Sequence, residues 1–132
     1  MRLINTRTLK LQEFYGDIPK YAILSHAWED GEVSFHEWGD ISKASQKRGY
    51  TKITGACRQA LEDELDYLWC DTNCIDKNSS AELTEAINSM FAWYRDAEVC
   101  YAYLSDVPAL DRNDRDIFEK FRKSRWFTRG WT

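Results

Sequence analysis

The chain has 132 residues, of which 43% are hydrophobic and 14% aromatic, and its 18 basic and 22 acidic side chains give a formal net charge of −4. This length fits one domain with enough apolar material for a core. The acidic balance argues against a nucleic-acid binder, which usually carries a basic patch. No apolar run is long enough to cross a membrane and no signal peptide is recognisable, so we expect a cytoplasmic protein without a membrane partner.

The cysteines and histidines form no recognisable metal-binding pattern. None of the four cysteines belongs to a CxxC pair, and neither histidine stands at zinc-ligand spacing from them (Cys57, Cys70, Cys74, Cys100; His26, His36). Three of the cysteines fall inside apolar runs, where reduced thiols act as small hydrophobic side chains. We therefore expect buried free thiols, no disulfide framework and no metal site.

The strand signals come first in chain order. A weak strand is indicated at residues 2–5, and three stronger ones at residues 21–25, 67–70 and 99–104. The three stronger runs are continuously apolar rather than alternating, which is typical of strands that are covered on both faces.

Helical periodicity separates these runs. Apolar side chains from Ile53 to Leu65 share one face, and a second amphipathic stripe runs from Leu83 to Tyr94. Ser79 and Glu82 stand at the spacing of a capping box, with Ser79 as the N-cap. A third, shorter helix is expected over residues 112–122, with its apolar side chains facing inward. We expect each of these helices to pack its apolar face against the sheet.

Strand and helix signals alternate in the order that is typical of an α/β domain with a mostly parallel sheet and helices on both faces. Residues 124–132 then form a dense aromatic segment with no closing element after it. We therefore expect an incomplete domain over residues 1–132, truncated after Thr132, in a protein that continues.

Candidate site residues follow the predicted strands, because α/β sheets bind ligands at the carboxyl ends of their strands. The candidates after the first two strong runs are Ser25, His26, Trp28, Asp71 and Asp76, and Ser105 and Asp106 follow the third. Each has a plain alternative: a hydrogen-bonded histidine, a core or lid tryptophan, or turn-forming aspartates. A catalytic Glu82 competes with its capping role. No glycine-rich phosphate loop is present, which weakens the case for the familiar nucleotide sites.

Four segments, taken together and in order, resemble the heterokaryon incompatibility (HET) domain family of fungi. Residues 21–28, YAILSHAW, resemble the opening motif, and residues 68–77, LWCDTNCIDK, the central block. Residues 79–97 are similar to the helix that follows the central block in that family. The segment RWFTRGW at residues 125–131 is similar to the family's terminal block. The resemblance covers nearly the whole chain.

The resemblance implies a module at the N-terminus of a larger fungal receptor-like protein. Its expected role is non-self recognition, a form of innate immunity that ends in programmed cell death, with activation through self-association. HET domains are distantly similar to Toll/interleukin-1 receptor (TIR) domains, which implies a TIR-like or flavodoxin-like fold.

Many TIR relatives cleave NAD at the nicotinamide bond with a catalytic glutamate. The family's equivalent glutamate lies beyond Thr132, so Glu82 and Asp71 are the catalytic candidates within this chain. The implied NAD-binding residues are Ser25, His26, Trp28, Asp71, Asp76, Arg129 and Trp131. Three functions stay open: a self-associating cell-death module, a TIR-like NAD glycohydrolase with NAD as its substrate, and a non-catalytic α/β interaction domain.

Overall fold

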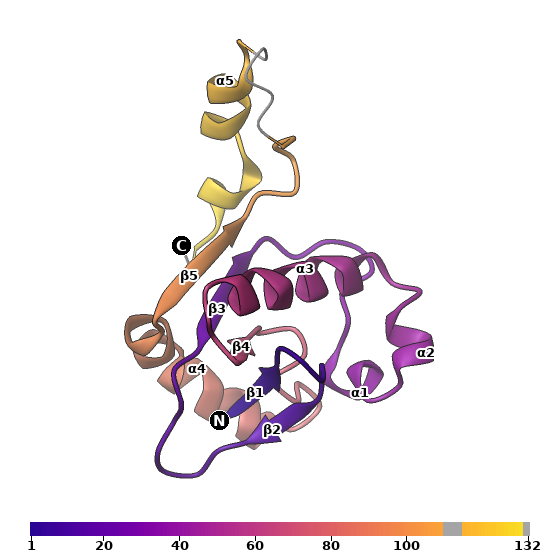
Figure 1. Cartoon of the computed structure of the whole chain (residues 1–132), viewed down its shortest axis with the longest axis vertical. Helices are drawn as coiled ribbons and strands as arrows, with labels where there is room; N and C mark the ends of the chain where they lie inside the picture. Colours follow the sequence, from indigo (N-terminus) through magenta and orange to yellow (C-terminus); the bar gives the residue numbers. More distant parts are fainter. Residues whose placement is uncertain (110–114, 131–132) are drawn as a thin grey trace.

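The computed structural model describes residues 1–109 and 115–130, and within these it forms one sheet with helices around it (Figure 1). Its strands are β1 (Arg2–Asn5), β2 (Leu11–Glu13), β3 (Ala22–His26), β4 (Tyr67–Trp69) and β5 (Val99–Tyr103). Its helices are α1 (Phe35–Trp38), α2 (Ile41–Ala44), α3 (Arg48–Glu62), α4 (Ser80–Asp96) and α5 (Ile117–Arg122), followed by the 3₁₀ helix η1 (Arg125–Thr128).

The sheet is mixed, which corrects the predicted mostly parallel sheet. Its strand order is β2-β1-β4-β3-β5. Strand β3 pairs in parallel with β4 and β5, whereas β1 is antiparallel to both β2 and β4. Only residues 6–10 connect β1 to β2, and a parallel neighbour needs a much longer crossover. The α/β class is confirmed, but the N-terminal half of the sheet is a hairpin that the sequence patterns did not indicate.

Helices α3 and α4 cover opposite faces of the sheet centre. Every residue of β3 is buried, as the continuous apolar run predicted. Helix α3 contacts β3 and β4. The Trp69 ring of β4 packs on α4, with its centroid 5.5 Å from that of Trp93 and 5.9 Å from that of Tyr94. Successive strand side chains point to opposite faces, so Leu68 beside it faces the α3 side and is fully buried.

Strand β5 differs from its prediction, because it is not covered on both faces. Val99 and Tyr101 are half-buried, whereas Cys100, Ala102 and Tyr103 are exposed. It pairs with β3 at the edge of the described sheet. A continuous apolar run therefore identified the strand but not its position in the sheet.

The predicted starts of the helices are confirmed in part. Helix α4 begins after the N-cap Ser79, whose Oγ accepts a hydrogen bond from the Glu82 backbone N–H at 3.3 Å. The reciprocal half of the capping box is absent, since the Glu82 carboxylate binds the Asp76 backbone N–H instead. Helix α5 begins at Ile117, later than predicted, and the earliest predicted positions, residues 112–114, lie outside the described residues.

Several apolar side chains expected in the core are exposed. On α4, Ile87 is 51% and Phe91 69% exposed. On α5, Ile117 is buried, but Phe118 is 76% and Phe121 47% exposed. Figure 1 shows the reason for the exposure on α5: this helix stands away from the sheet, beyond the end of β5.

The cysteines follow their predicted environment with one exception. All four are reduced, and Cys57, Cys70 and Cys74 are buried, but Cys100 is exposed on the edge strand β5. No helix within the described part of the chain is long and apolar enough to span a membrane.

Candidate functional site

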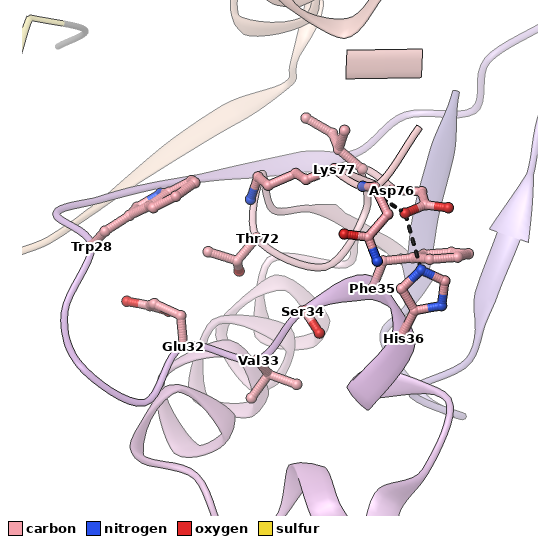
Figure 2. A pocket seen from close by; sticks show the side chains of 11 residues that line it. Trp28, Glu32, Val33, Ser34, Phe35, His36, Thr72, Asp76 and Lys77 are labelled. Atoms are coloured by element: carbon pink, nitrogen blue, oxygen red, sulfur yellow. Dashed lines mark hydrogen bonds and ion pairs between the residues drawn. The ribbon is translucent and has the colours of Figure 1, made fainter. Parts of the chain in front are cut away.

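The carboxyl ends of β3 and β4 lie side by side and open into a cavity of about 240 Å³ (Figure 2). The loop after β3 supplies one wall and the loop after β4 supplies the other. The cavity is lined by Trp28, Glu32, Val33, Ser34, Phe35, His36, Thr72, Ile75, Asp76, Lys77 and Asn78. This is the strand-end edge that the sequence predicted for a binding site.

Asp71 links the two loops behind the cavity. Its Oδ1 lies 2.9 Å from His26 Nε2, and its Oδ2 accepts a hydrogen bond from Trp28 Nε1 at 2.8 Å. Burial by itself raises the pKa of Asp71, but the hydrogen bonds from His26 and Trp28 and the charge of Lys77 outweigh it and lower the pKa. The carboxylate is therefore held ionised by His26 and Trp28, which were predicted as site residues, and by Lys77, which was not.

His26 is fully buried and carries the complementary charge. Burial by itself lowers the pKa of His26, but its hydrogen bond with Asp71 and the neighbouring Cys70 raise it to about 9. The other ring nitrogen, Nδ1, is buried without a hydrogen-bond partner and lies 3.7 Å from Glu32 Oε1. His26 thus forms an ion pair with Asp71 and keeps one polar atom unpartnered.

Trp28 and Lys77 form an amphipathic wall of the cavity. The Lys77 Nζ lies 4.0 Å from the centre of the Trp28 ring and donates a hydrogen bond to the Asp71 carbonyl oxygen at 2.8 Å. Burial lowers the pKa of Lys77. The Trp28 side remains open to solvent, with 55% of the residue exposed. An aromatic face and an ammonium group are therefore presented together at the cavity (Figure 2).

Asp76 and His36 form the opposite end of the cavity, where Figure 2 shows them paired. The His36 Nε2 lies 3.1 Å from Asp76 Oδ1, which also accepts a hydrogen bond from the Asn78 backbone N–H at 3.0 Å. Asp76 was predicted as a site residue, but His36 was not. The two are 40 positions apart, and no local spacing indicates their contact.

Glu32 is the second cavity residue that the sequence patterns missed. Its Oε1 accepts a hydrogen bond from Lys52 Nζ at 2.5 Å and from the Glu29 backbone N–H at 3.0 Å. Its Oε2 is buried and has no hydrogen-bond partner. The place of the Glu32 side chain in the cavity follows from the packing of α3 against the loop after β3. That packing exists only in the folded chain, so no local sequence pattern indicates it.

Ser25 and Arg129 meet each other away from the cavity. The buried Ser25 Oγ accepts hydrogen bonds from Arg129 Nη1 at 3.0 Å and Trp126 Nε1 at 3.2 Å. These contacts dock the segment around η1 onto the end of β3. Trp131, the remaining predicted binding residue, lies outside the described residues.

The end of β5 also binds the C-terminal segment rather than the cavity. The Asp106 carboxylate accepts hydrogen bonds from Ser124 Oγ at 2.6 Å and the Arg125 backbone N–H at 2.8 Å. Ser105 Oγ donates to Glu29 Oε1 at 2.7 Å. The third predicted strand end therefore has a structural partner.

Glu82 lies in a different place from Asp71. Its carboxylate forms an ion pair with Arg2 and accepts a hydrogen bond from the Asp76 backbone N–H at 2.9 Å. It lines a separate cavity of about 400 Å³ beside β1 and β2, with Arg2, Glu13 and Tyr15. The two catalytic candidates thus do not share one site.

These features define an α/β domain whose strand ends carry a small cavity that combines an apolar, partly aromatic wall with a few charged and polar side chains. A family model described as "Heterokaryon incompatibility protein (HET)" matches residues 21–116. Over 123 residues, 89% of the chain, the sequence is 51% identical to "Vegetative incompatibility protein HET-E-1" of Podospora anserina. The chain therefore belongs to the HET family, and the predicted family is confirmed. It spans 9% of the length of that relative. No solved structure matches the chain.

Proposed function

We propose that this domain is the death-inducing module of a fungal heterokaryon-incompatibility protein and that it acts through self-association in the cytoplasm. Its relative is named a vegetative incompatibility protein, and the chain corresponds to 9% of that protein's length. Recognition of non-self therefore falls to other domains of a receptor-like protein. The domain's own task is to convert that recognition into a death signal.

The observation that carries self-association is the exposed apolar face of α4. Ile87 and Phe91 are one helical turn apart and are 51% and 69% exposed. Large apolar side chains that gather on a helix surface mark interaction sites more often than singly exposed ones do. An isolated helix face of this kind supports a weak contact that high local concentration strengthens, as when receptors cluster.

Phe91→Glu in the full-length protein tests this proposal. Thr51→Glu, on the exposed side of α3, is the matched control because it makes the same charge change away from α4. We expect F91E to abolish concentration-dependent association in analytical ultracentrifugation and cell death in a fungal host, while T51E retains both. Cell death by a strictly monomeric F91E protein would refute self-association through this face.

A second candidate function, NAD hydrolysis, is favoured by the strand-end cavity. Cleavage of the nicotinamide bond needs an aromatic wall for the nicotinamide and a carboxylate near the oxocarbenium-like ribosyl centre. Trp28 and Asp71 are of these types, and Lys77 is an ammonium group suited to phosphate. The cavity, of about 240 Å³, is below the roughly 300 Å³ of common ligand pockets, so we assign to it only the nicotinamide riboside half of NAD.

Asp71 is the stronger of the two catalytic candidates within the chain. Its carboxylate lies beside the cavity, and Glu82 is bound by Arg2 on the other side of the loop. The resemblance to TIR domains implies a further catalytic glutamate after Thr132, so the longer protein is the form to assay. His26, Asp76, Ser25 and Arg129 then act as positioning residues rather than as groups that contact NAD.

The decisive assay is NAD consumption by the full-length protein at high concentration, beside residues 1–132 alone. We expect the full-length protein to consume NAD and both Trp28→Ala and Asp71→Asn to reduce the rate at least tenfold. The control is Lys20→Ala, which removes an exposed lysine far from the cavity. A folded, self-associated full-length protein that leaves NAD intact would refute the enzyme and favour the non-catalytic interaction domain.

A further inference from the structure

We propose that His26, Cys70 and Asp71 form a binding site for a divalent transition metal ion of the zinc class. This inference shares Asp71 and His26 with the proposed NAD site but does not rest on NAD hydrolysis. The ligand atoms of the three residues, an imidazole nitrogen, a thiol sulfur and a carboxylate oxygen, all lie within 4.8 Å of one another. His26 ends β3, and Cys70 and Asp71 follow β4, so the pairing of two parallel strands brings them together.

The two distances from His26 Nε2 are close to those of a tetrahedral metal centre. The Cys70 Sγ lies 3.7 Å and the Asp71 Oδ1 2.9 Å from His26 Nε2. Zinc bonds of about 2.3 Å to sulfur and about 2.05 Å to nitrogen place those two atoms about 3.5 Å apart. The same geometry places nitrogen and oxygen about 3.3 Å apart, so the carboxylate needs to withdraw by only about 0.4 Å.

Each ligand already has a neighbour that orients it. Asp71 Oδ2 accepts a hydrogen bond from Trp28 Nε1 at 2.8 Å, and Cys70 Sγ lies 3.2 Å from the Thr72 hydroxyl. Ligands held in this way by an outer shell of hydrogen bonds are a regular property of metal sites. The cluster is therefore oriented as a unit. An ion that enters releases two protons to solvent, one from His26 Nε2 and one from the Cys70 thiol.

The unpartnered atoms of His26 and Glu32 are the second observation that points to a metal. His26 Nδ1 and Glu32 Oε2 are buried without hydrogen-bond partners, and Nδ1 lies 3.7 Å from Glu32 Oε1. Buried polar atoms without partners are rare and need an explanation. A metal on Nε2 fixes the tautomer that carries hydrogen on Nδ1, and Glu32 is then its acceptor in a carboxylate–histidine–metal arrangement.

The donor set selects the class of metal. Thiolate and imidazole favour Zn²⁺ or Co²⁺ over Ca²⁺ and Mg²⁺, which prefer oxygen ligands. Three protein ligands leave a fourth position for solvent, as in zinc sites that bind exchangeable ligands. Trp28, Glu32 and Thr72 contact the cluster and also line the strand-end cavity, so the cluster lies directly behind the cavity wall.

Cobalt titration of the reduced, chelator-treated full-length protein tests the site. We expect one Co²⁺ per chain, a thiolate-to-cobalt absorption band in the near ultraviolet, and loss of the band when Zn²⁺ displaces Co²⁺. Cys70→Ser should abolish the band, and Asp71→Asn should weaken cobalt binding at least tenfold. The matched control is Cys100→Ser, which removes the exposed thiol and should leave the spectrum unchanged.

Absence of the thiolate band from the wild-type protein overturns the proposal, as does a band that persists in C70S. If C70S does not fold, the proposal is tested by the wild-type spectrum and by the cobalt affinity of D71N, because neither measurement needs the C70S protein. NAD turnover does not enter this test. A protein without NADase activity that gives the cobalt spectrum still supports the metal site.

Discussion

The buried ion pair between Lys52 and Glu32 is the most informative place to perturb this domain. The pair joins α3 to the loop after β3, at an Nζ–Oε1 distance of 2.5 Å, and the side chains are only 5% and 15% exposed. Lys52→Met keeps the apolar stem and removes the charge. It leaves the Glu32 carboxylate with the Glu29 backbone N–H as its remaining hydrogen-bond donor.

The expected cost of K52M is about 3 kcal/mol of unfolding free energy. Removing one partner of a buried pair costs about 3–5 kcal/mol. The partial exposure of Glu32 and the nearby His26 ring, whose Nδ1 lies 3.7 Å from Glu32 Oε1, favour the low end. Adding Glu32→Gln removes the stranded charge. The double variant should therefore lose only about 1 kcal/mol, comparable to one ordinary hydrogen bond.

Urea denaturation of the wild type, both single variants and the double variant at pH 7 measures the coupling. The control is Lys43→Met, whose pair with Asp40 is 73% and 43% exposed and should contribute less than about 0.5 kcal/mol. Additivity of the K52M and E32Q effects within about 0.5 kcal/mol would refute the reasoning, because independent sites behave in that way.

Three further predictions concern stability. A Cβ at Gly49 of α3 would lie 3.0 Å from backbone atoms of the preceding loop, whereas a Cβ at Gly55 would meet nothing within 4 Å. Urea denaturation should therefore show that Gly55→Ala raises the unfolding free energy by about 0.5–1 kcal/mol and that Gly49→Ala lowers it. The ion pair with Lys47 and the hydrogen bonds at the start of α1 lower the pKa of Glu37 from 4.5 to about 2. This stabilisation is complete above pH 4.5 and is lost as the pH falls towards 2. Because Glu37 is 32% exposed, screening limits the cost of E37Q at neutral pH to about 1 kcal/mol. An acid titration followed by circular dichroism should show this difference shrinking as the pH falls through 2 and vanishing below it. Trp69→Ala should lower the unfolding free energy in urea by about 3–5 kcal/mol, because it removes the large ring that packs between β4 and α4 and leaves a cavity there.

The elements that the sequence predicted are those with a local signature. Strands β3 and β4 are short apolar runs between polar segments, and α3 and α4 are long enough for periodicity. Strand β2 and helices α1 and α2 span three or four residues each, too few for a period to show. Contacts distant in sequence support them, such as the hydrogen bond from Trp38 Nε1 to the Leu9 carbonyl oxygen.

The candidate site divides in the same way. His26, Trp28 and Asp71 were predicted because they follow strands, and the structure brings them into contact. Glu32 and His36 were missed because their partners lie 20 and 40 positions away. Ser25 lies beside His26 in β3, but its side chain binds the η1 segment, since neighbouring positions on a strand face opposite sides.

The strand order also governs how the domain is completed on the ribosome. Strands β1 to β4 are contiguous in the sheet and are contained, with α3, in residues 1–69, whereas β5 joins the outer side of β3 much later in the sequence. Synthesis delivers the N-terminal part first, so a four-stranded block can assemble before α4 and β5 emerge. Until α4 covers it, Trp69 lies bare on one face of that block, and a nascent chain at this stage is a natural client for chaperones.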